Sequence, residues 1–435
     1  MLSTDDLDLC RRNPALAGLE KAFDPSYIHR ALVSHGIDID DPGSIQAYYI
    51  RHKPQTSTLI AYRLKHANQE YRLTIRVHLE AAPEKIEKPL KRAKGNHSPL
   101  GPAAIRLQDL CGIIMFFPHD HELSALSSIA ASLSQRQEQA AAMAALSLPA
   151  GDTLTCLAYK PERRYVGKLE AENQPAHVIK LHDRRTYPTF MQSSMQASRS
   201  NFSFCQNAMS FCDRQRLVVY PWIDGQPLSE AMDDNPAILK DVAARLAEWH
   251  RAHRSATQVV DPATSLEQRI RSSAASLQEI LPELADAGLR IASELIAAWH
   301  RLVRTLPATP ALIHGDFSAD QVIIGQDGPV LLDFDRARLD LPVHDLGSFI
   351  ARLEYQAVLG DSTESMAREA RQRLIGAYSS ANPSQPIWGL EISVTAHLLC
   401  LVSEPFRRRQ PHWAEQMRQL LARTRALLES ARHGA

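Results

Sequence analysis

The sequence predicts an α+β fold, with strands in the first half of the chain and helices in the second. Apolar residues recur at helical spacing from residue 229 onward, most clearly at 239–253 and 291–306. Two short apolar runs, 322–324 and 330–332, flank a Gly-Gln-Asp-Gly turn and predict a hairpin inside the helical half. The remaining strand-like runs are rich in β-branched and aromatic residues and lie at 48–50, 58–62, 73–77, 112–117, 154–159, 165–169, 177–181 and 217–222.

The composition of the 435-residue chain excludes several classes of protein. Lys plus Arg and Asp plus Glu number 49 each, so the net charge is zero and no broad positive field for nucleic acid is expected. No run reaches the about 18 apolar residues that a membrane helix requires. The acidic N-terminus lacks the apolar core of a secretory signal, and the six cysteines are scattered without a CxxC pair. We therefore expect a cytoplasmic protein; its oligomeric state is left open.

The region before residue 150 contains a pattern that returns later in the chain. Residues 1–45 predict short helices, and the Ala-rich stretch 123–148 predicts an amphipathic helix. A Lys-Pro pair at 53–54 precedes a strand-like run that ends in Ile-Arg-Val-His at 75–78. A second Lys-Pro pair, at 160–161, precedes one that ends in Ile-Lys-Leu-His at 179–182. An internal repeat and a chance likeness both remain open.

The segment 311–346 carries the residues suited to chemistry. It contains His314-Gly315-Asp316, then Gln321 at the start of the predicted hairpin and Asp333 at its end. A loop followed by a hairpin brings Asp316, Gln321 and Asp333 together. Phosphoryl transfer needs one carboxylate to align the attacking hydroxyl, and a second carboxylate with an amide oxygen to hold Mg²⁺.

These three elements, in this order and spacing, resemble the aminoglycoside phosphotransferase and small-molecule kinase family, relatives of the protein kinases. The resemblance implies a two-lobed protein-kinase-like fold that uses ATP and Mg²⁺. It implies that Asp316 is the catalytic base and that His314 braces the loop. Gln321 and Asp333 would bind the metal, and Asp345 would cap a helix starting at Leu346 and tie that helix to the loop.

The same resemblance has gaps as well as matches. The family usually has Asn at the position of Gln321; maltokinases, which also have Gln and an N-terminal cap, are partly similar. Lys180 is the candidate for the nucleotide phosphates, and Tyr220 and Trp222 are candidates for the adenine-binding hinge. No glycine-rich loop lies between the first two strands of this lobe, although residues 162–164 could take its place, and no Glu occurs from 183 to 212.

Three segments follow from this interpretation: a cap region at 1–150 that could be a degenerate repeat of the N-lobe, a nucleotide-binding N-lobe and hinge at 151–222, and a helical C-lobe at 223–435. The predicted activity is transfer of the γ-phosphate to a hydroxyl of a small metabolite, for which Gln321 suggests a sugar. The alternative is a nucleotide-binding module without turnover. A protein kinase is disfavoured, because no Ala-Pro-Glu segment follows Asp333. His250 and His253 are expected to be helix-face residues.

Overall fold

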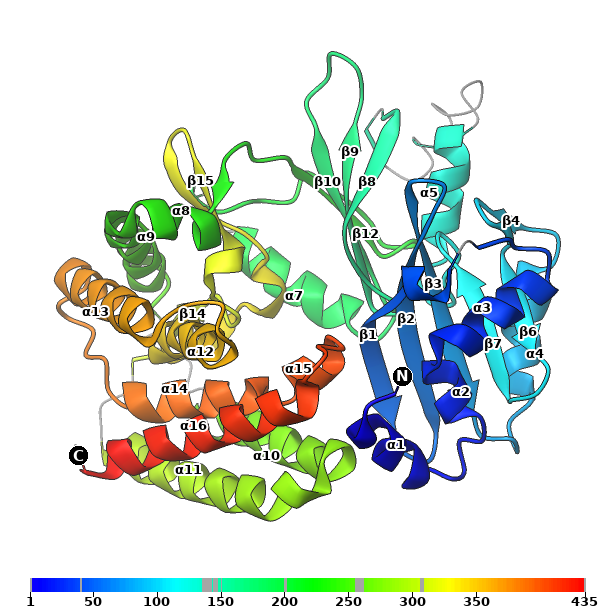
Figure 1. The fold of residues 1–435 in the computed structure, drawn as a ribbon. Helices are drawn as coiled ribbons and strands as arrows, with labels where there is room; N and C mark the ends of the chain where they lie inside the picture. Colours follow the sequence, from blue (N-terminus) through cyan, green and yellow to red (C-terminus); the bar gives the residue numbers. More distant parts are fainter. Residues whose placement is uncertain are drawn as a thin grey trace. The chain divides into compact units, whose positions relative to one another are not determined.

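The computed structural model describes residues 2–39, 41–134, 143, 148–149, 151–198, 202–254, 262–305 and 309–433. The chain divides into two compact units. The first comprises Met1–Tyr187, Met209–Trp222 and Pro405–Trp413, and the second comprises Pro188–Ala208, Ile223–Glu404 and Ala414–Ala435. Strands dominate the first unit and helices the second, as Figure 1 shows, so the predicted α+β fold is confirmed.

Three short helices open the first unit, as predicted: α1 (Thr4–Arg11), α2 (Leu19–Phe23) and α3 (Pro25–Ser34). Their starts follow from local capping. Ser3 accepts a hydrogen bond from the Asp6 amide at the start of α1. Asp24 accepts from the amides of Ser26 and Tyr27, with Pro25 in the first turn of α3.

The N-terminal sheet is antiparallel and follows these helices. Its strand order is β1 (Ile45–Lys53), β2 (Ser57–His66), β3 (Gln69–His78), β7 (Gly112–Phe116) and β6 (Ala104–Leu107). Helix α4 (Glu84–Ala93) and the two short strands β4 (His97–Ser98) and β5 (Gly101–Pro102) lie between β3 and β6 in the sequence.

The second sheet of this unit contains β8 (Thr153–Lys160), β9 (Arg164–Glu170), β10 (His177–His182), β12 (Leu217–Pro221) and β11 (Ser210–Cys212), in that spatial order. Its buried residues, among them Tyr165, Leu181 and Val219, share a core with Leu126 and Ile129 of α5 (Ala125–Ser134). The helix predicted at 123–148 is confirmed for α5, whereas 135–142 and 144–147 lie outside the described residues.

The two sheets follow the same path through the chain. In each sheet, the first three strands form an antiparallel meander. The third strand pairs with the strand that comes last in the sequence, and the strand just before that one in the sequence lies at the edge. The first strand carries a bulge in both sheets, at 47–49 and at 156–158. The register of the second and third strands also corresponds, since Ser57 pairs with His78 in one sheet and Arg164 pairs with His182 in the other. Arg76 and Lys180 each lie two residues before these histidines and therefore occupy corresponding positions.

The second unit is built largely from helices that pack around buried Trp249 and Trp299. Helix α12 packs on α13 and α14, and α13 packs on α9. Gly347 permits the close approach of α12 to α14, because a β-carbon there would lie 2.2 Å from Ser393 Oγ. Most of this unit's helical residues lie in α7 (Tyr187–Ser198), α8 (Leu228–Asp234), α9 (Leu239–Ala252), α10 (Pro262–Ile280), α11 (Ala285–Thr305), α12 (Val343–Leu359), α13 (Glu364–Ala381), α14 (Leu390–Leu401) and α16 (Trp413–His433). Helix α15 (Glu404–Arg407) belongs to the first unit except for Glu404.

None of the helices in the described part of the chain is long and apolar enough to cross a membrane.

Candidate active site

The candidate active site lies on short strands inserted among the helices of the second unit. Strand β14 (Ala311–Ile313) leads into the His314-Gly315-Asp316 loop and pairs with β17 (Arg338–Asp340). The short helical turn η4 (Ala319–Gln321) then opens the hairpin of β15 (Val322–Gly325) and β16 (Gly328–Leu331). The predicted hairpin is therefore confirmed, and a two-residue strand β13 (Gln226–Pro227) extends it.

Gly315 fixes the path of the loop. Its φ of +81° is a conformation that L side chains rarely adopt. A β-carbon at this position would lie 2.2 Å from the Arg336 carbonyl oxygen, so the loop can approach that backbone only with glycine. Gly315 thus places Asp316 beside the segment that follows Asp333.

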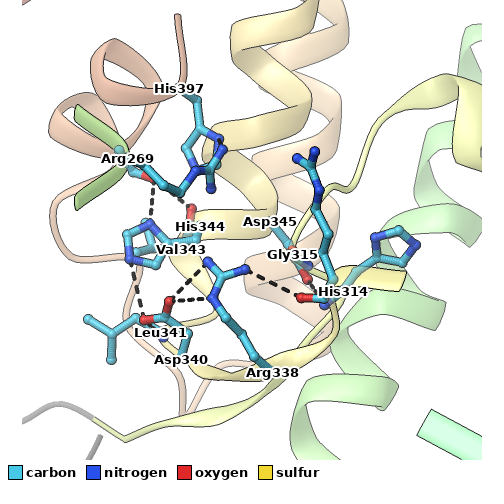
Figure 2. Close-up of polar contacts among 12 residues, drawn as sticks. Arg269, His314, Gly315, Arg338, Asp340, Leu341, Val343, His344, Asp345 and His397 are labelled. Atoms are coloured by element: carbon cyan, nitrogen blue, oxygen red, sulfur yellow. Dashed lines mark hydrogen bonds and ion pairs between the residues drawn. The ribbon is translucent and has the colours of Figure 1, made fainter. Parts of the chain in front are cut away.

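The Asp345 side chain holds the His314-Gly315-Asp316 loop in place. Its buried carboxylate accepts hydrogen bonds from the amides of His314, at 2.7 Å, and Gly315, at 2.8 Å (Figure 2). The predicted tie between helix and loop is present, but the predicted cap is wrong. Helix α12 begins at Val343 and has no side-chain cap, because Asp345 lies inside its first turn and its oxygens are used by the loop.

The anchor continues to His250 on α9. This side chain is fully buried, with Nε2 3.0 Å from Asp345 Oδ2 and Nδ1 2.8 Å from the Tyr378 hydroxyl. His250 lies on the buried face of α9, as expected for a helix-face residue, but its contact with Asp345 was not predicted. Its spacing of four from Leu246 on the apolar stripe of α9 was the available signal. His253 is half-buried, and its Nδ1 lies 2.8 Å from the Trp249 carbonyl oxygen.

The electrostatics of this anchor favour an ionised Asp345. Burial by itself raises the pKa of a carboxyl. The hydrogen bond from His250 and the charges of His250 and His314, together with the Gly315 amide, outweigh burial and lower the pKa of Asp345 below its ordinary value. An ionised carboxylate is the stronger acceptor for the two loop amides.

The hairpin brings Gln321 next to Asp333 along the backbone. The Leu332 amide donates to the Gln321 carbonyl at 2.9 Å, and His314 Nε2 lies 2.6 Å from the Leu332 carbonyl oxygen. Asp333 adopts φ 62° and ψ 55°, a left-handed conformation that is uncommon for residues other than glycine. Such strained residues occur preferentially at functional sites. Asp316 is half-exposed, and its Oδ1 lies 3.3 Å from Arg336 Nη1.

The residues present fit a hard divalent cation. Gln321 and Asp333 supply an amide oxygen and a carboxylate, the donors that Mg²⁺ takes from proteins when phosphates and waters provide the rest. A site made only of protein ligands is not expected here, since the described residues contain no group of three His, Cys, Asp or Glu side chains that could hold a metal ion.

The candidates for nucleotide binding lie in the first unit. Lys180 is buried in β10, the middle strand of the second sheet, and its Nζ lies 5.0 Å from the centroid of the Tyr220 ring. Trp222 follows β12, and Lys168 Nζ lies 4.4 Å from the centroid of its ring. The structure thus brings Lys180 and Tyr220 together, and separately it brings the loop and hairpin residues together.

Two sets of residues near the loop were missed by sequence reasoning. His250 is one, and the other comprises Arg269, Arg336 and Arg338. Arg336 and Arg338 stand in the sequence Asp-Arg-Ala-Arg directly after Phe334, a local cluster of cations that could have been noted. Arg269 lies on α10, and nothing in its local sequence connects it to the loop.

Comparison with known proteins gives one family match. Residues 200–382 match the APH phosphotransferase enzyme family, and this segment contains the whole loop and hairpin. Comparison with curated protein sequences gives no significant match.

The chain is also similar to solved kinase structures at low identity. A choline kinase from Cryptosporidium parvum is 15% identical, with a TM-score of 0.49, over 64% of this chain and 89% of that one. The choline kinase LicA from Streptococcus pneumoniae is 12% identical, with a TM-score of 0.49, over 68% and 100%. The ADP-bound aminoglycoside phosphotransferase APH(2'')-Ib is 16% identical, with a TM-score of 0.45, over 67% and 96%.

Proposed function

We propose that this chain, a phosphotransferase-family protein over residues 200–382, transfers the γ-phosphate of ATP to a hydroxyl group of a small molecule. One observation carries the proposal. The His314-Gly315-Asp316 loop is held by Asp345 and lies next to a hairpin that sets Gln321 beside Asp333. This arrangement supplies the carboxylates and the amide that phosphoryl transfer requires.

Each residue of the loop and hairpin has a role in the proposal. Asp316 orients the acceptor hydroxyl and accepts its proton as the oxygen attacks the γ-phosphorus. His314 holds the backbone at Leu332, and therefore Asp333, in position. Gln321 and Asp333 hold Mg²⁺, which when bound neutralises charge on the nucleotide phosphates.

The nucleotide-binding part of the proposal concerns residues 151–222. Lys180 contacts the phosphates, and the segment containing Tyr220 and Trp222 contacts the adenine. The buried position of Lys180 in the middle of the sheet supports this role, because a buried lysine gains most from an anionic partner. Residues 223–435 form the catalytic lobe, and the protein works in the cytoplasm.

The region 1–150 is a degenerate repeat of this nucleotide-binding lobe in our proposal. The common strand path, the bulge in each first strand and the common register support a repeat. The position of Lys180 is taken by Arg76, whose Nη1 lies 2.8 Å from Glu162 Oε1. With its cation already paired to a protein carboxylate, the first copy serves to hold the turn between β8 and β9.

The test is transfer of labelled γ-phosphate from ATP·Mg²⁺ to a panel of hydroxyl compounds, sugars first because Gln321 suggests them. Asp316→Asn and Asp333→Asn keep the shape of each side chain and remove its charge, so we expect each to lower kcat by about 10³-fold or more with little change in melting temperature. Asp327→Asn, in the hairpin turn, is the matched control and should keep full activity. Saturable ATP binding without transfer to any acceptor would favour the nucleotide-binding module without turnover.

A further inference from the structure

Three arginines of the second unit lie near the loop that carries Asp316, and one of them contacts its carboxylate. Arg336 pairs with Asp316, and Arg338 Nη1 donates to the Arg336 carbonyl oxygen at 3.4 Å. Arg269 reaches the same neighbourhood from α10. Burial lowers the pKa of Arg269, the charges of Arg338 and Arg336 lower it further, and Cys400 and Asp316 act in the opposite direction. Three positive charges therefore share this part of the site.

Two carboxylates near these arginines are already engaged by Arg338 and Arg336. Asp340 is buried and committed to Arg338, with both guanidinium contacts at 3.0 Å, and it also accepts the Leu341 amide (Figure 2). Asp316 is paired with Arg336. Within the described residues Arg269 forms no ion pair, and its guanidinium hydrogen-bonds to His397 Nδ1 at 3.4 Å. A partly buried cation without a carboxylate is unfavourable until an anion joins it.

His397 adds a second unsatisfied group beside Arg269. It is 4% exposed, and burial together with the charge of Arg269 lowers its pKa well below the ordinary value, so the ring is neutral. Because Arg269 donates to Nδ1, the hydrogen of the neutral ring lies on Nε2. This buried N–H has no hydrogen-bond partner among the described residues. Unused donors next to an unpaired guanidinium are what an anion requires.

We propose that the acceptor carries an anionic group, a carboxylate or a phosphate, in addition to the hydroxyl that becomes phosphorylated, and that Arg269 and Arg336 bind this group. The inference rests on the proposed phosphotransferase function. A guanidinium forms paired, charge-assisted hydrogen bonds to either anion, which fixes orientation as well as charge. An acceptor carrying an amine at this position would instead be repelled by the two guanidinium groups.

The anionic acceptor also gives Arg336 a part in the reaction. In the structure Arg336 is bound to Asp316. An acceptor anion takes over Arg336 and leaves Asp316 free to receive a proton. The acceptor oxygen then forms a bond to the γ-phosphorus, and the bond from that phosphorus to the oxygen that bridges it to the β-phosphorus breaks. The proton passes to Asp316, and ADP leaves with the electron pair.

The experiment compares acceptors that differ in charge. Glucose, gluconate, glucose 6-phosphate, glucosamine and choline are supplied with ATP·Mg²⁺, and ADP formation is measured for the wild type, Arg269→Gln and Arg336→Gln. The control is Arg271→Gln, an exposed arginine on the same helix that pairs with Glu267. We expect gluconate or glucose 6-phosphate to be the best substrate, and these two arms separate a carboxylate from a phosphate. Arg269→Gln should raise the acceptor KM about 10- to 100-fold and leave the KM for ATP unchanged.

The outcomes separate this inference from the proposed function. If glucose, glucosamine or choline is phosphorylated as well as or better than gluconate and glucose 6-phosphate, the anionic acceptor is wrong while the kinase activity stands. An equal acceptor KM in Arg269→Gln and Arg271→Gln has the same meaning. Absence of transfer to every compound counts against the proposed function itself.

If no compound is phosphorylated, thermal unfolding in the presence of ADP tests the anion site. A rise in melting temperature with inorganic phosphate or tartrate, lost in Arg269→Gln and kept in Arg271→Gln, supports the site. No rise in the wild type overturns it.

Discussion

The two sheets of the first unit share a backbone plan and differ in what they hold at corresponding positions. In the second sheet Lys180 is buried near Tyr220. In the N-terminal sheet Arg76 forms an ion pair with Glu162, and Arg51 pairs with the same carboxylate. A strand order fixes where a side chain lies, whereas its partner decides what the position can do. The N-terminal sheet therefore uses its cation in an ion pair inside the protein, whereas the corresponding cation of the second sheet lies near the Tyr220 ring.

The turns that join the first two strands show the same contrast. Both span three residues, and the middle residue has positive φ, 51° at Gln55 and 57° at Glu162. Gln55 is exposed, whereas Glu162 is 9% exposed and its amide donates to Asp120 at 2.8 Å. The second turn, unlike the first, is therefore held by two arginines and an aspartate.

The largest expected effect, on kcat/KM for ATP, distinguishes Lys180 from Arg76. Replacing Lys180 by Met should lower kcat/KM for ATP by about 10²- to 10³-fold, because the proposed contact of its charge with the phosphates is lost. Arg76→Met should change that ratio less than about 10-fold. Steady-state kinetics on folded variants measures both, and a larger loss in Arg76→Met would reverse the assignment of the two sheets.

The next largest effect, on the free energy of unfolding, tests the buried carboxylate of Glu162. Glu162→Gln removes the charge that neutralises Arg51 and Arg76, so we expect a loss of about 3 kcal/mol in the free energy of unfolding. Denaturant titration measures it. The double variant Glu162→Gln with Arg76→Met should regain part of this stability, since it leaves fewer unpaired charges. A single variant as stable as the wild type would show that the turn is not held in this way.

A smaller effect concerns His78, which corresponds to His182 in the second sheet. Burial lowers the pKa of His78 to about 4, and the positive charges of Arg76, Lys85 and His121 contribute. Its folded pKa lies below its unfolded value near 6.5, so the unfolded chain binds the proton first and stability falls as pH decreases from 6.5 toward 4. We expect His78 to contribute about 1 kcal/mol of this loss between pH 6.5 and 5.5. Chemical denaturation at both pH values should show a shallower dependence in His78→Leu than in the wild type.

The smallest effect is expected at the exposed turn. Gln55→Ala should change the free energy of unfolding by less than about 0.5 kcal/mol, because Gln55 does not occupy a buried, charge-paired position like that of Glu162. It is thus the matched control for Glu162→Gln. A loss comparable with that of Glu162→Gln would show that the backbone conformation, not the buried charge, gives the second turn its stability.

Much of the candidate site follows from a short stretch of sequence. The order His314-Gly315-Asp316, Gln321 and Asp333 falls within 20 residues on a loop and a hairpin, whose turn residues and apolar runs specify a local geometry. The strands and helices could be predicted for the same reason, since their periodicity is a local property. The nucleotide roles of Lys180, Tyr220 and Trp222 remain predictions.

Tertiary structure alone decided which distant side chains support and surround these residues. His250 meets Asp345 across 95 positions of the chain, Arg76 meets Glu162 across 86, and Arg269 meets His397 across 128. Each pair depends on how separate elements pack, and no local pattern records that packing. The sequence by itself determined that a phosphotransferase-like loop is present. The packing decided that its helix anchor is Asp345 with His250 and that Arg269 lies near Arg336 and Asp316, because the charges of a site are summed over space and not along the chain.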